Sequence, residues 1–266
     1  MKTRVISAVL ALALLVPCLV MWGTLAVEWL VGLVMLVGLY EFSRMALPGR
    51  SKAVLPLGAA GALLYASALD CIELSMHHSM VLSAVFLLLW SLFQKSEVDE
   101  AFLNMSKLFL GLVWVVLGAT HIALLAQEPL GVPWVVLLLL IIFAGDTGAY
   151  FSGRAFGRRK LYERVSPKKT WAGVYGGLVA STAATIAFAH YELPELAPEK
   201  AVGLAILVGS AGVCGDLVES LVKRACGVKD SGSIMPGHGG ALDRIDSLLL
   251  GAPVMYVLVD WWVLSA

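Results

Sequence analysis

Residues 131–150 read GVPWVVLLLLIIFAGDTGAY, and this stretch decides the class of the fold. Every residue from Trp134 to Ala144 is apolar, and Asp146 is the first charge that follows. The run approaches the roughly 20 residues that an α-helix needs to cross a bilayer. A carboxylate near the membrane interior is costly unless it faces a cavity or a partner. The stretch therefore predicts a membrane-spanning helix that ends close to a polar site.

The rest of the chain repeats this apolar pattern. Its 266 residues are 59% hydrophobic and 14% charged, whereas a soluble domain usually has about 25% charged residues. A soluble fold could not bury so much apolar surface, so the sequence predicts an all-α, polytopic membrane helical bundle. We expect nine transmembrane helices, from apolar runs at about 5–22, 24–40, 53–70, 79–93, 107–126, 131–150, 172–190, 201–222 and 247–264.

The charged residues divide between the two sides of the predicted membrane. With the N-terminus in the cytoplasm, 18 of the 19 Lys and Arg residues fall on cytoplasmic segments, and only Lys200 falls outside. The outer loops carry acidic residues instead, namely Asp70, Glu73, Glu128, Glu192, Glu195 and Glu199. Because basic loops are retained in the cytoplasm, the sequence predicts an N-in, C-out topology.

The unusual polar residues are concentrated in the second half of the chain. We expect residues 1–130 to form an N-terminal transmembrane scaffold. Residues 131–266 should form a transmembrane region with a cytoplasmic-facing site, within one integrated membrane domain. Its two large polar segments, 151–171 and 223–246, face the cytoplasm in the predicted topology. The net charge is zero, so no overall field favours a nucleic-acid partner.

The end of the 131–150 run allows a close approach to Asp146. Gly145 and Gly148 flank this carboxylate and leave room for a neighbouring helix or a ligand. The alternative is an aspartate at the membrane interface that simply meets water.

The segment 166–173 reads SPKKTWAG. Pro167 keeps Ser166 extended, so Lys168 and Lys169 should lie just before a helix. Positive charge and free N–H groups at a helix start suit a phosphate. Ordinary anchoring of lysines at the cytoplasmic interface is the alternative.

The segment 215–224 reads GDLVESLVKR. Asp216, Glu219 and Lys223 share one helical face. Two carboxylates inside an apolar helix need a partner, which is either Lys223 or a cation. An internal ion-pair ladder that fixes helix packing is the alternative.

The segment 229–247 reads KDSGSIMPGHGGALDRIDS. Pro236 and its glycines exclude a regular helix, and backbone N–H groups at glycines can approach an anion closely. Asp243 and Asp246 stand at the start of the last span, with Arg244 able to bind a phosphate through two N–H groups. Carboxylates also suit Mg²⁺, which binds phosphates. An acidic helix cap is the alternative for the two aspartates.

Carboxylates and a surplus of basic residues thus converge on one membrane face. This pattern predicts a metal-assisted site for a phosphorylated substrate, which acts by neutralising and positioning charge.

The segment 220–246 resembles the signature of phosphatidate cytidylyltransferases, also called CDP-diacylglycerol synthases. D-x-x-A-Y from Asp146, G-R-x-F-G-R-x-K at 153–160 and S-P-x-K-T-W at 166–171 also look like this family. The resemblance is clear over about 140–250, and the N-terminal half matches only in being hydrophobic. The matching residues of the signature are Ser220, Lys223, Arg224, Lys229, Asp230, Gly232, Pro236, His238, Gly239, Gly240, Asp243, Arg244, Ile245 and Asp246.

The resemblance implies a nucleotidyltransferase of phospholipid biosynthesis that converts CTP and phosphatidic acid to CDP-diacylglycerol and pyrophosphate. It implies that Asp216, Asp243 and Asp246 hold Mg²⁺, alone or with a second cation. The catalytic residues would be Asp216, Lys223, Arg224, Asp243, Arg244 and Asp246. The substrate-binding residues would be Asp146, Ser166, Lys168, Lys169, Lys229, His238, Gly239 and Gly240.

The implied partners are CTP, phosphatidic acid and membrane lipids, and a homodimer is implied by the family alone. The compact size of the chain favours the inner membrane of a bacterium, with the active site facing the cytoplasm. Glu28 and Glu41 stand at span ends and are expected to face lipid headgroups, with Glu41 within reach of Arg44.

Three other functions compete with this one. A membrane-bound lipid or isoprenoid kinase that uses CTP would release CDP rather than pyrophosphate. A transporter would use Asp146, Asp216 and Glu219 to carry protons or ions, but would not need the long basic, glycine-rich cytoplasmic segment. A CDP-alcohol phosphatidyltransferase would carry a D-G-x-x-A-R motif, which this chain lacks.

Overall fold

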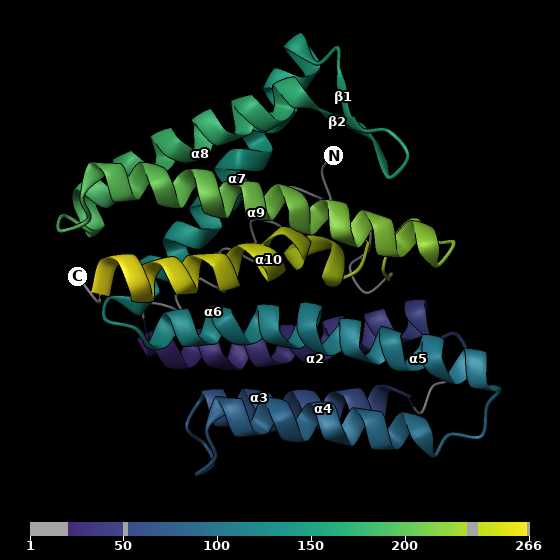
Figure 1. Cartoon of the computed structure of the whole chain (residues 1–266). Coiled ribbons are helices and arrows are strands. Elements are labelled where there is room, and N and C mark those ends of the chain that lie inside the picture. The colour runs from purple at the N-terminus through teal and green to yellow at the C-terminus, as the bar shows by residue number, and fades with distance from the viewer. Residues whose placement is uncertain (1–20, 50–52, 233–238, 265–266) are drawn as a thin grey trace. The chain divides into compact units, whose positions relative to one another are not determined.

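The computed structural model describes residues 21–49, 53–232 and 239–264 (Figure 1). Most of these residues are helical, which confirms the all-α prediction at the level of fold class. The helices are α2 (Thr24–Ala46), α3 (Val54–Ala68), α4 (Met76–Leu92), α5 (Val98–Gly111), α6 (Leu117–Gln127), α7 (Gly131–Phe156), α8 (Trp171–Glu192), α9 (Pro198–Ala225) and α10 (Leu242–Leu258), with π-helical turns η2 (Leu112–Val116) and η3 (Val259–Leu264).

Five helical segments in the described residues are long and apolar enough to cross a bilayer. They are Thr24–Ala46, Val98–Gln127, Gly131–Phe156, Trp171–Glu192 and Pro198–Ala225. The segment Val98–Gln127 combines α5, η2 and α6 into one continuous helix. The helices α3 and α4 are apolar but shorter.

Each apolar run from 24–40 onward coincides with one helical segment. The run 5–22 falls almost wholly outside the described residues. The nine spans and the N-in, C-out orientation therefore stay predictions.

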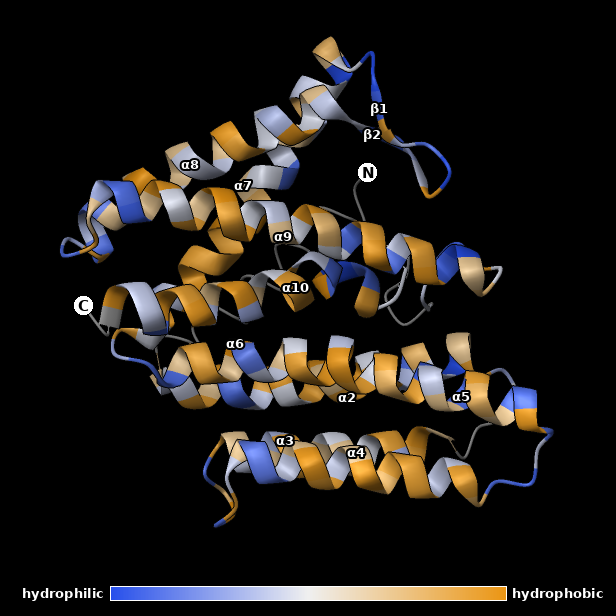
Figure 2. Ribbon diagram, viewed as in Figure 1, coloured by the Kyte–Doolittle hydropathy of each residue, from blue (hydrophilic) through white to orange (hydrophobic). Residues whose placement is uncertain are grey.

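Polar residues gather in the connections between helices, as Figure 2 shows. Apolar residues dominate α2 to α9, whereas the polar residues are concentrated in the β1–β2 hairpin and in the α4–α5 and α8–α9 connections. This distribution is typical of a chain whose helices lie in lipid and whose loops lie in water.

A short β-hairpin interrupts the helices, and the sequence did not predict it. Strand β1 (Lys160–Tyr162) pairs antiparallel with β2 (Ser166–Thr170), with Lys160 opposite Thr170 and Tyr162 opposite Ser166. Strands this short leave no alternating pattern to recognise. The strand β2 leads directly into α8, where the Thr170 side chain accepts a hydrogen bond from the Gly173 N–H at 3.2 Å. The prediction that Lys168 and Lys169 lie just before a helix is confirmed.

The chain divides into two compact units. The first unit comprises residues up to Leu124 together with Cys226–Arg244, and the second comprises Leu125–Ala225 with Ile245–Ala266. The described residues of 226–244 therefore cluster with the N-terminal helices, and the predicted division near residue 130 stays a prediction.

The core of the first unit surrounds the C-terminal part of α2. Met35, Leu39 and Phe42 of this helix are fully buried, as are Leu57 and Leu64 of α3. Phe42 also meets the Trp114 ring edge-on, at 6.2 Å between ring centroids. The apolar side chains thus enclose the last two turns of α2, including the position of Glu41.

Small residues bring α7 and α8 of the second unit unusually close together. A Cβ atom added at Gly148 would lie 2.5 Å from Ala180 Cβ and 2.7 Å from the Gly176 carbonyl oxygen. The Ser181 hydroxyl donates a 2.6 Å hydrogen bond to the Ile141 carbonyl. Helices in membranes pack through such small residues, so the space beside Asp146 at Gly145 and Gly148 is taken by a helix.

Candidate active site

An ion pair between β2 and α9 forms the centre of the candidate site in the second unit. The Lys169 Nζ atom lies 2.7 Å from Asp216 Oδ2 and 3.5 Å from the Val213 carbonyl oxygen. The Ser220 hydroxyl donates to Asp216 Oδ1 at 3.3 Å. The partner of Asp216 is therefore Lys169 of the hairpin, whereas the sequence had suggested Lys223 or a cation.

Two further carboxylates share the electrostatic environment of this pair. Asp146 on α7 is repelled by Asp216 and attracted by Lys169. Asp246, in the first turns of α10, is repelled by Asp216 and attracted by Lys223. The second unit thus brings Asp146, Lys169, Asp216 and Asp246 within electrostatic reach of one another.

A second ion pair lies closer to the C-terminal end of α9. Glu219 Oε2 is 2.5 Å from Lys223 Nζ, and the Glu219 side chain is only 1% exposed. A buried charge is tolerated when it is paired in this way. Lys223 therefore neutralises Glu219, one turn from Asp216 on the same helix.

A cavity of about 390 Å³ opens beside Asp146 and Lys169. Its basic side chains are Arg154, Lys168 and Lys169, and its single carboxylate is Asp146. The Arg154 guanidinium donates to the Tyr150 hydroxyl at 3.2 Å. The lining residues are Asp146, Ala149, Tyr150, Gly153, Arg154, Lys168, Lys169, Thr170, Gly173, Val174 and Val213. The excess of positive charge, between apolar helices, suits an anionic group carried by a lipid or a nucleotide.

Ser166 is not among the residues that line this cavity. It is half-buried at the far end of β2, opposite Tyr162. Its predicted role in substrate binding stays a prediction.

The first unit contains the other predicted carboxylate, Asp243. Its Oδ2 atom accepts hydrogen bonds from the Gly240 N–H at 2.8 Å and the Ser231 N–H at 3.0 Å. The Ser231 hydroxyl also lies 3.0 Å from this oxygen. Asp243 thus joins the two ends of the segment 231–240, and Gly239 assists the turn with a left-handed φ of 83°.

Glu41 corrects a prediction. The sequence suggested that it faces lipid headgroups near Arg44, but α2 continues to Ala46 and Glu41 is only 2% exposed. Its Oε2 atom accepts a 2.9 Å hydrogen bond from the Leu242 N–H. Arg44 instead donates to the Tyr40 hydroxyl at 3.1 Å.

The remaining predicted basic residues lie at the surface of their units. Arg224, Lys229 and Arg244 are exposed. His238 lies outside the described residues. These positions leave the predicted roles in phosphate binding untested.

The carboxylates of the second unit suit a magnesium ion. In the described residues, no three His, Cys, Asp or Glu side chains are grouped to hold a metal. Mg²⁺, however, usually takes only one or two carboxylates from a protein and fills its other positions with water and substrate phosphates. Asp216 and Asp246 lie near enough for their like charges to interact, so these two residues would be the ones to hold such an ion. Asp243 as a further ligand stays a prediction.

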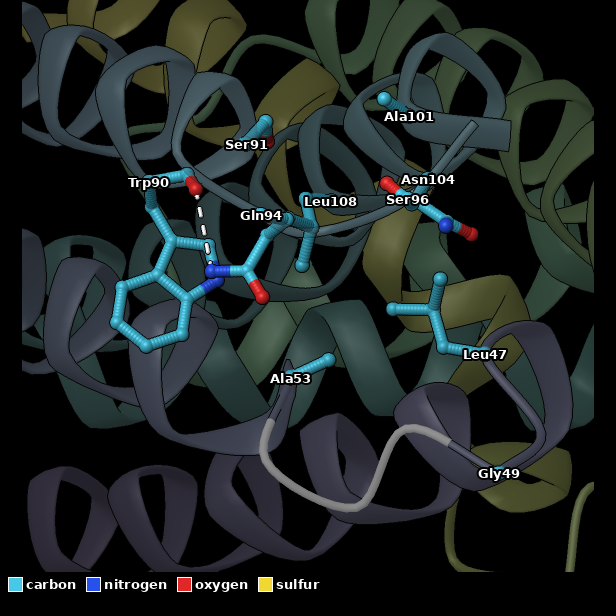
Figure 3. Close-up of a pocket in the computed structure, with 10 residues that line it drawn as sticks. All are labelled: Leu47, Gly49, Ala53, Trp90, Ser91, Gln94, Ser96, Ala101, Asn104 and Leu108. Atoms are coloured by element: carbon cyan, nitrogen blue, oxygen red, sulfur yellow. Dashed lines mark hydrogen bonds between the residues drawn. The ribbon is translucent and has the colours of Figure 1, made fainter. Parts of the chain in front are cut away.

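A separate cavity of about 290 Å³ lies in the first unit (Figure 3). Gln94 donates to the Trp90 carbonyl at 3.3 Å beside it. Its lining includes no predicted site residue: Leu47, Gly49, Ala53, Trp90, Ser91, Gln94, Ser96, Ala101, Asn104 and Leu108. This cavity does not contribute to the candidate site.

Sequence reasoning missed four residues that the structure places beside predicted ones: Tyr150, Arg154, Ser231 and Glu41. Tyr150 and Arg154 follow Asp146 by four and eight residues, so their helical spacing could have indicated a shared face. Glu41 directly follows an apolar run, and this position could likewise have indicated that its carboxylate is buried beside a partner. No local signal distinguishes Ser231.

Several known proteins are similar to this chain in sequence. The pattern of the cytidylyltransferase family matches residues 2–262. A protein of Staphylococcus haemolyticus (strain JCSC1435) named phosphatidate cytidylyltransferase is 32% identical over 264 residues, which cover 97% of this chain and 99% of that protein. A Pseudomonas aeruginosa protein of the same name is 34% identical over 270 residues, with 97% of each chain covered.

A Haemophilus influenzae protein with that name is 46% identical over a shorter stretch of 120 residues, or 44% of this chain and 42% of that protein. The family pattern covers almost every residue, and two relatives align along nearly their whole length. The chain therefore belongs to the cytidylyltransferase family.

Proposed function

We propose that this protein transfers the cytidylyl group of CTP to phosphatidic acid, yielding CDP-diacylglycerol and pyrophosphate. The observation that carries the proposal is the cavity of the second unit, where Arg154, Lys168 and Lys169 lie beside Asp146 at the ends of apolar helices. The names of the full-length relatives support the same reaction.

The reaction needs no protein nucleophile. An oxygen of the lipid phosphate attacks the α-phosphorus of CTP, and the bond from that phosphorus to the bridging oxygen of pyrophosphate breaks. A phosphate monoester is already largely ionised near pH 7, since its second pKa is about 6. The protein therefore has to position two anions and neutralise their repulsion.

Basic side chains of the cavity are suited to that task. Lys168 and Lys169 precede the N-terminus of α8, where backbone N–H groups add positive potential. Arg154 can bind a phosphate through two parallel N–H donors. We assign Lys168 and Lys169 to the triphosphate and Arg154 to either phosphate group.

Magnesium is the proposed cofactor, and Asp216 and Asp246 would hold it. When bound, Mg²⁺ would neutralise phosphate charge and polarise the phosphoryl oxygens. The Lys169 ammonium group, which pairs with Asp216, would then divide its hydrogen bonds between that carboxylate and a substrate phosphate. Asp243 as a further ligand, and a second cation, belong to the same proposal.

The proposed setting is a bacterial inner membrane, with nine spans, the N-terminus inside and the site open to the cytoplasm. The distribution of basic residues along the sequence supports this orientation. CTP would then arrive from the cytoplasm, and phosphatidic acid from the inner leaflet. A homodimer is proposed from the family alone, and the absence of a nucleic-acid partner from the zero net charge.

Purified protein in detergent micelles tests the proposal. With CTP, phosphatidic acid and Mg²⁺, we expect CDP-diacylglycerol and pyrophosphate in equal amounts, and loss of both on chelation. Asp246→Asn should lose most of the activity. Glu195→Gln, an exposed carboxylate in the α8–α9 connection, serves as the matched control and should retain it.

The products also separate the competing functions. Release of CDP with a phosphorylated lipid would contradict the proposal in favour of a CTP-dependent lipid kinase. Folded protein that forms no nucleotide product would contradict it in favour of a transporter.

A further inference from the structure

We propose that Glu41 is a positioning residue that holds Ser231, Gly240 and Leu242, and through them the Asp243 carboxylate, in the geometry needed for cytidylyl transfer. This inference rests on the proposed function. All of the contacts that support it lie within the first unit, between the end of α2 and the segment that leads into α10.

The Glu41 carboxylate satisfies a backbone donor that α10 cannot satisfy itself. Leu242 is the first residue of α10, and the first N–H groups of a helix have no partner within the helix. The Leu242 N–H donates to Glu41 Oε2 at 2.9 Å, from a residue 201 positions away in the sequence. The positive end of the helix dipole also favours a negative charge there. Glu41 thus caps α10 from another helix.

The same carboxylate touches both ends of the 231–240 segment. The Ser231 hydroxyl lies 3.4 Å from Glu41 Oε2 and 3.0 Å from Asp243 Oδ2. A hydroxyl has one proton, so it can donate fully to only one of these carboxylates, and the shorter contact favours Asp243. Glu41 and Asp243 therefore meet at Ser231.

At Gly232 and Gly240, the backbone approaches the Glu41 carboxylate too closely for a side chain. A Cβ atom at Gly232 would overlap Glu41 Oε1, and one at Gly240 would overlap Glu41 Oε2 and the Ser231 hydroxyl. The backbone at neither glycine has the left-handed φ that would itself require glycine. The close approach of the glutamate is the reason that both positions need a residue without a side chain.

These contacts give a defined path from Glu41 to Asp243. Glu41 accepts a hydrogen bond from the Leu242 N–H, one residue before Asp243. The Ser231 and Gly240 N–H groups and the Ser231 hydroxyl donate to Asp243 Oδ2. Without Glu41, the start of α10 loses this acceptor, so Asp243 would keep its own donors while the backbone that carries it is held less firmly.

Substitution at Glu41 tests the proposal through a kinetic signature. We expect Glu41→Ala to lower kcat by about 100-fold, the scale of a misplacement near 1 Å, with little change in KM for either substrate. Glu41→Gln keeps one carbonyl oxygen as an acceptor and should recover a large part of kcat. Glu28→Ala, in the same helix, is the matched control and should keep the wild-type kcat.

A double-mutant cycle with Gly232 separates positioning from a general loss of structure. Gly232→Ala alone should lower activity because its Cβ meets the Glu41 carboxylate. In Glu41→Ala this obstacle is gone, so adding Gly232→Ala should cost little more. Fully additive losses would overturn the proposed contact, because independent sites add.

Hydrogen exchange followed by mass spectrometry gives a readout that does not depend on catalysis. Peptides that cover 239–246 should exchange faster in Glu41→Ala than in wild-type protein or Glu28→Ala, while peptides from α8 stay unchanged. Unchanged exchange at 239–246, or acceleration across the whole chain, would overturn the inference. If Glu41→Ala speeds exchange at 239–246 as expected but wild-type protein forms no CDP-diacylglycerol, the proposed function would be contradicted and the Glu41 contacts would not.

Discussion

Lys169 is the residue on which the candidate site of the second unit depends. It pairs with Asp216, lines the cavity and stands next to the first turn of α8. We predict that Lys169→Gln lowers kcat/KM for CTP by about 100-fold, the loss typical of removing one preorganised charge-stabilising group. Lys169→Arg, which keeps the charge, should lose less.

The neighbouring hairpin lysine provides the control for Lys169. Lys160 is exposed on β1 and does not line the cavity, so Lys160→Gln should leave kcat/KM close to the wild-type value. Initial rates of CDP-diacylglycerol formation at varied CTP concentrations measure both effects. Equal losses in Lys160→Gln and Lys169→Gln would contradict a specific role for Lys169.

The buried Glu219–Lys223 pair also contributes to the stability of the protein. Because the Glu219 side chain is almost fully buried, replacing Lys223 by an apolar residue removes a positive partner from a carboxylate inside the protein. We predict that Lys223→Met destabilises the protein by about 3–5 kcal/mol. The double variant Glu219→Leu with Lys223→Met should recover most of that stability. Unfolding in detergent followed by circular dichroism measures it, and a fully stable Lys223→Met protein would refute the assignment.

The polar residues of α9 could be predicted from the sequence only in part. Helical spacing correctly placed Asp216, Glu219 and Lys223 on one face of α9. It also offered Lys223 as a partner for the two carboxylates, and Lys223 pairs with Glu219 four residues away. It could not indicate that Asp216 pairs with Lys169, because that lysine lies in a hairpin 47 residues away along the chain. Side-chain partners across tertiary contacts leave no local signal.

Among the helices, α7 and α8 pack closely and both line the cavity of the second unit. A Cβ at Gly148 would meet Ala180 and the backbone of Gly176, and backbone atoms cannot easily move aside. We predict that Gly148→Ala destabilises the protein by roughly 1–3 kcal/mol, as overpacking does, and lowers activity by displacing Asp146. Thermal unfolding and the transfer assay measure the two effects.

Gly58 in α3 is the matched control for Gly148. Its added Cβ would meet no atom within 4 Å, so Gly58→Ala should gain about 0.5–1 kcal/mol from reduced backbone entropy in the unfolded chain. Destabilisation of similar size at both glycines would show that helix–helix contact is not the cause.

Elements were more predictable than their ends. Long apolar stretches gave the positions of the helices, because only a helix satisfies its backbone within lipid. The limits of α2 and α5 differed, since α2 continues through Glu41 to Ala46 and α5 begins at Val98, before polar residues such as Asp99. Glu41 has a tertiary hydrogen bond from Leu242, whereas Asp99 and Glu100 are exposed in the first turn of α5, where the helix dipole favours acidic residues. Hydropathy reports neither effect.

The proposed orientation is the property of the whole molecule that experiment can test first. With native cysteines replaced, Glu163→Cys in the β1–β2 hairpin should be protected from a membrane-impermeant thiol reagent in intact cells. Glu195→Cys in the α8–α9 connection should react. The opposite labelling pattern would reverse the predicted N-in, C-out topology. Both side chains are exposed, so accessibility within the fold does not bias the comparison.

At the scale of the whole molecule, the sequence identified the family, but it did not indicate how distant segments pack against one another. The basic, glycine-rich signature marked the family and most of the charged residues. The contribution of α2 to the 226–244 segment could not be read from it, because Glu41 is separated from Leu242 by 200 intervening residues. The N-terminal helices therefore do more than support the C-terminal half.

The fate of the phosphates of CTP tests the central claim most directly. Purified protein would receive phosphatidic acid and Mg²⁺ with CTP labelled at either the α- or the γ-phosphorus. Cytidylyl transfer predicts that the α-label enters the lipid and that the γ-label appears only in pyrophosphate. A γ-label that enters the lipid, with CDP as the other product, would contradict the proposed reaction.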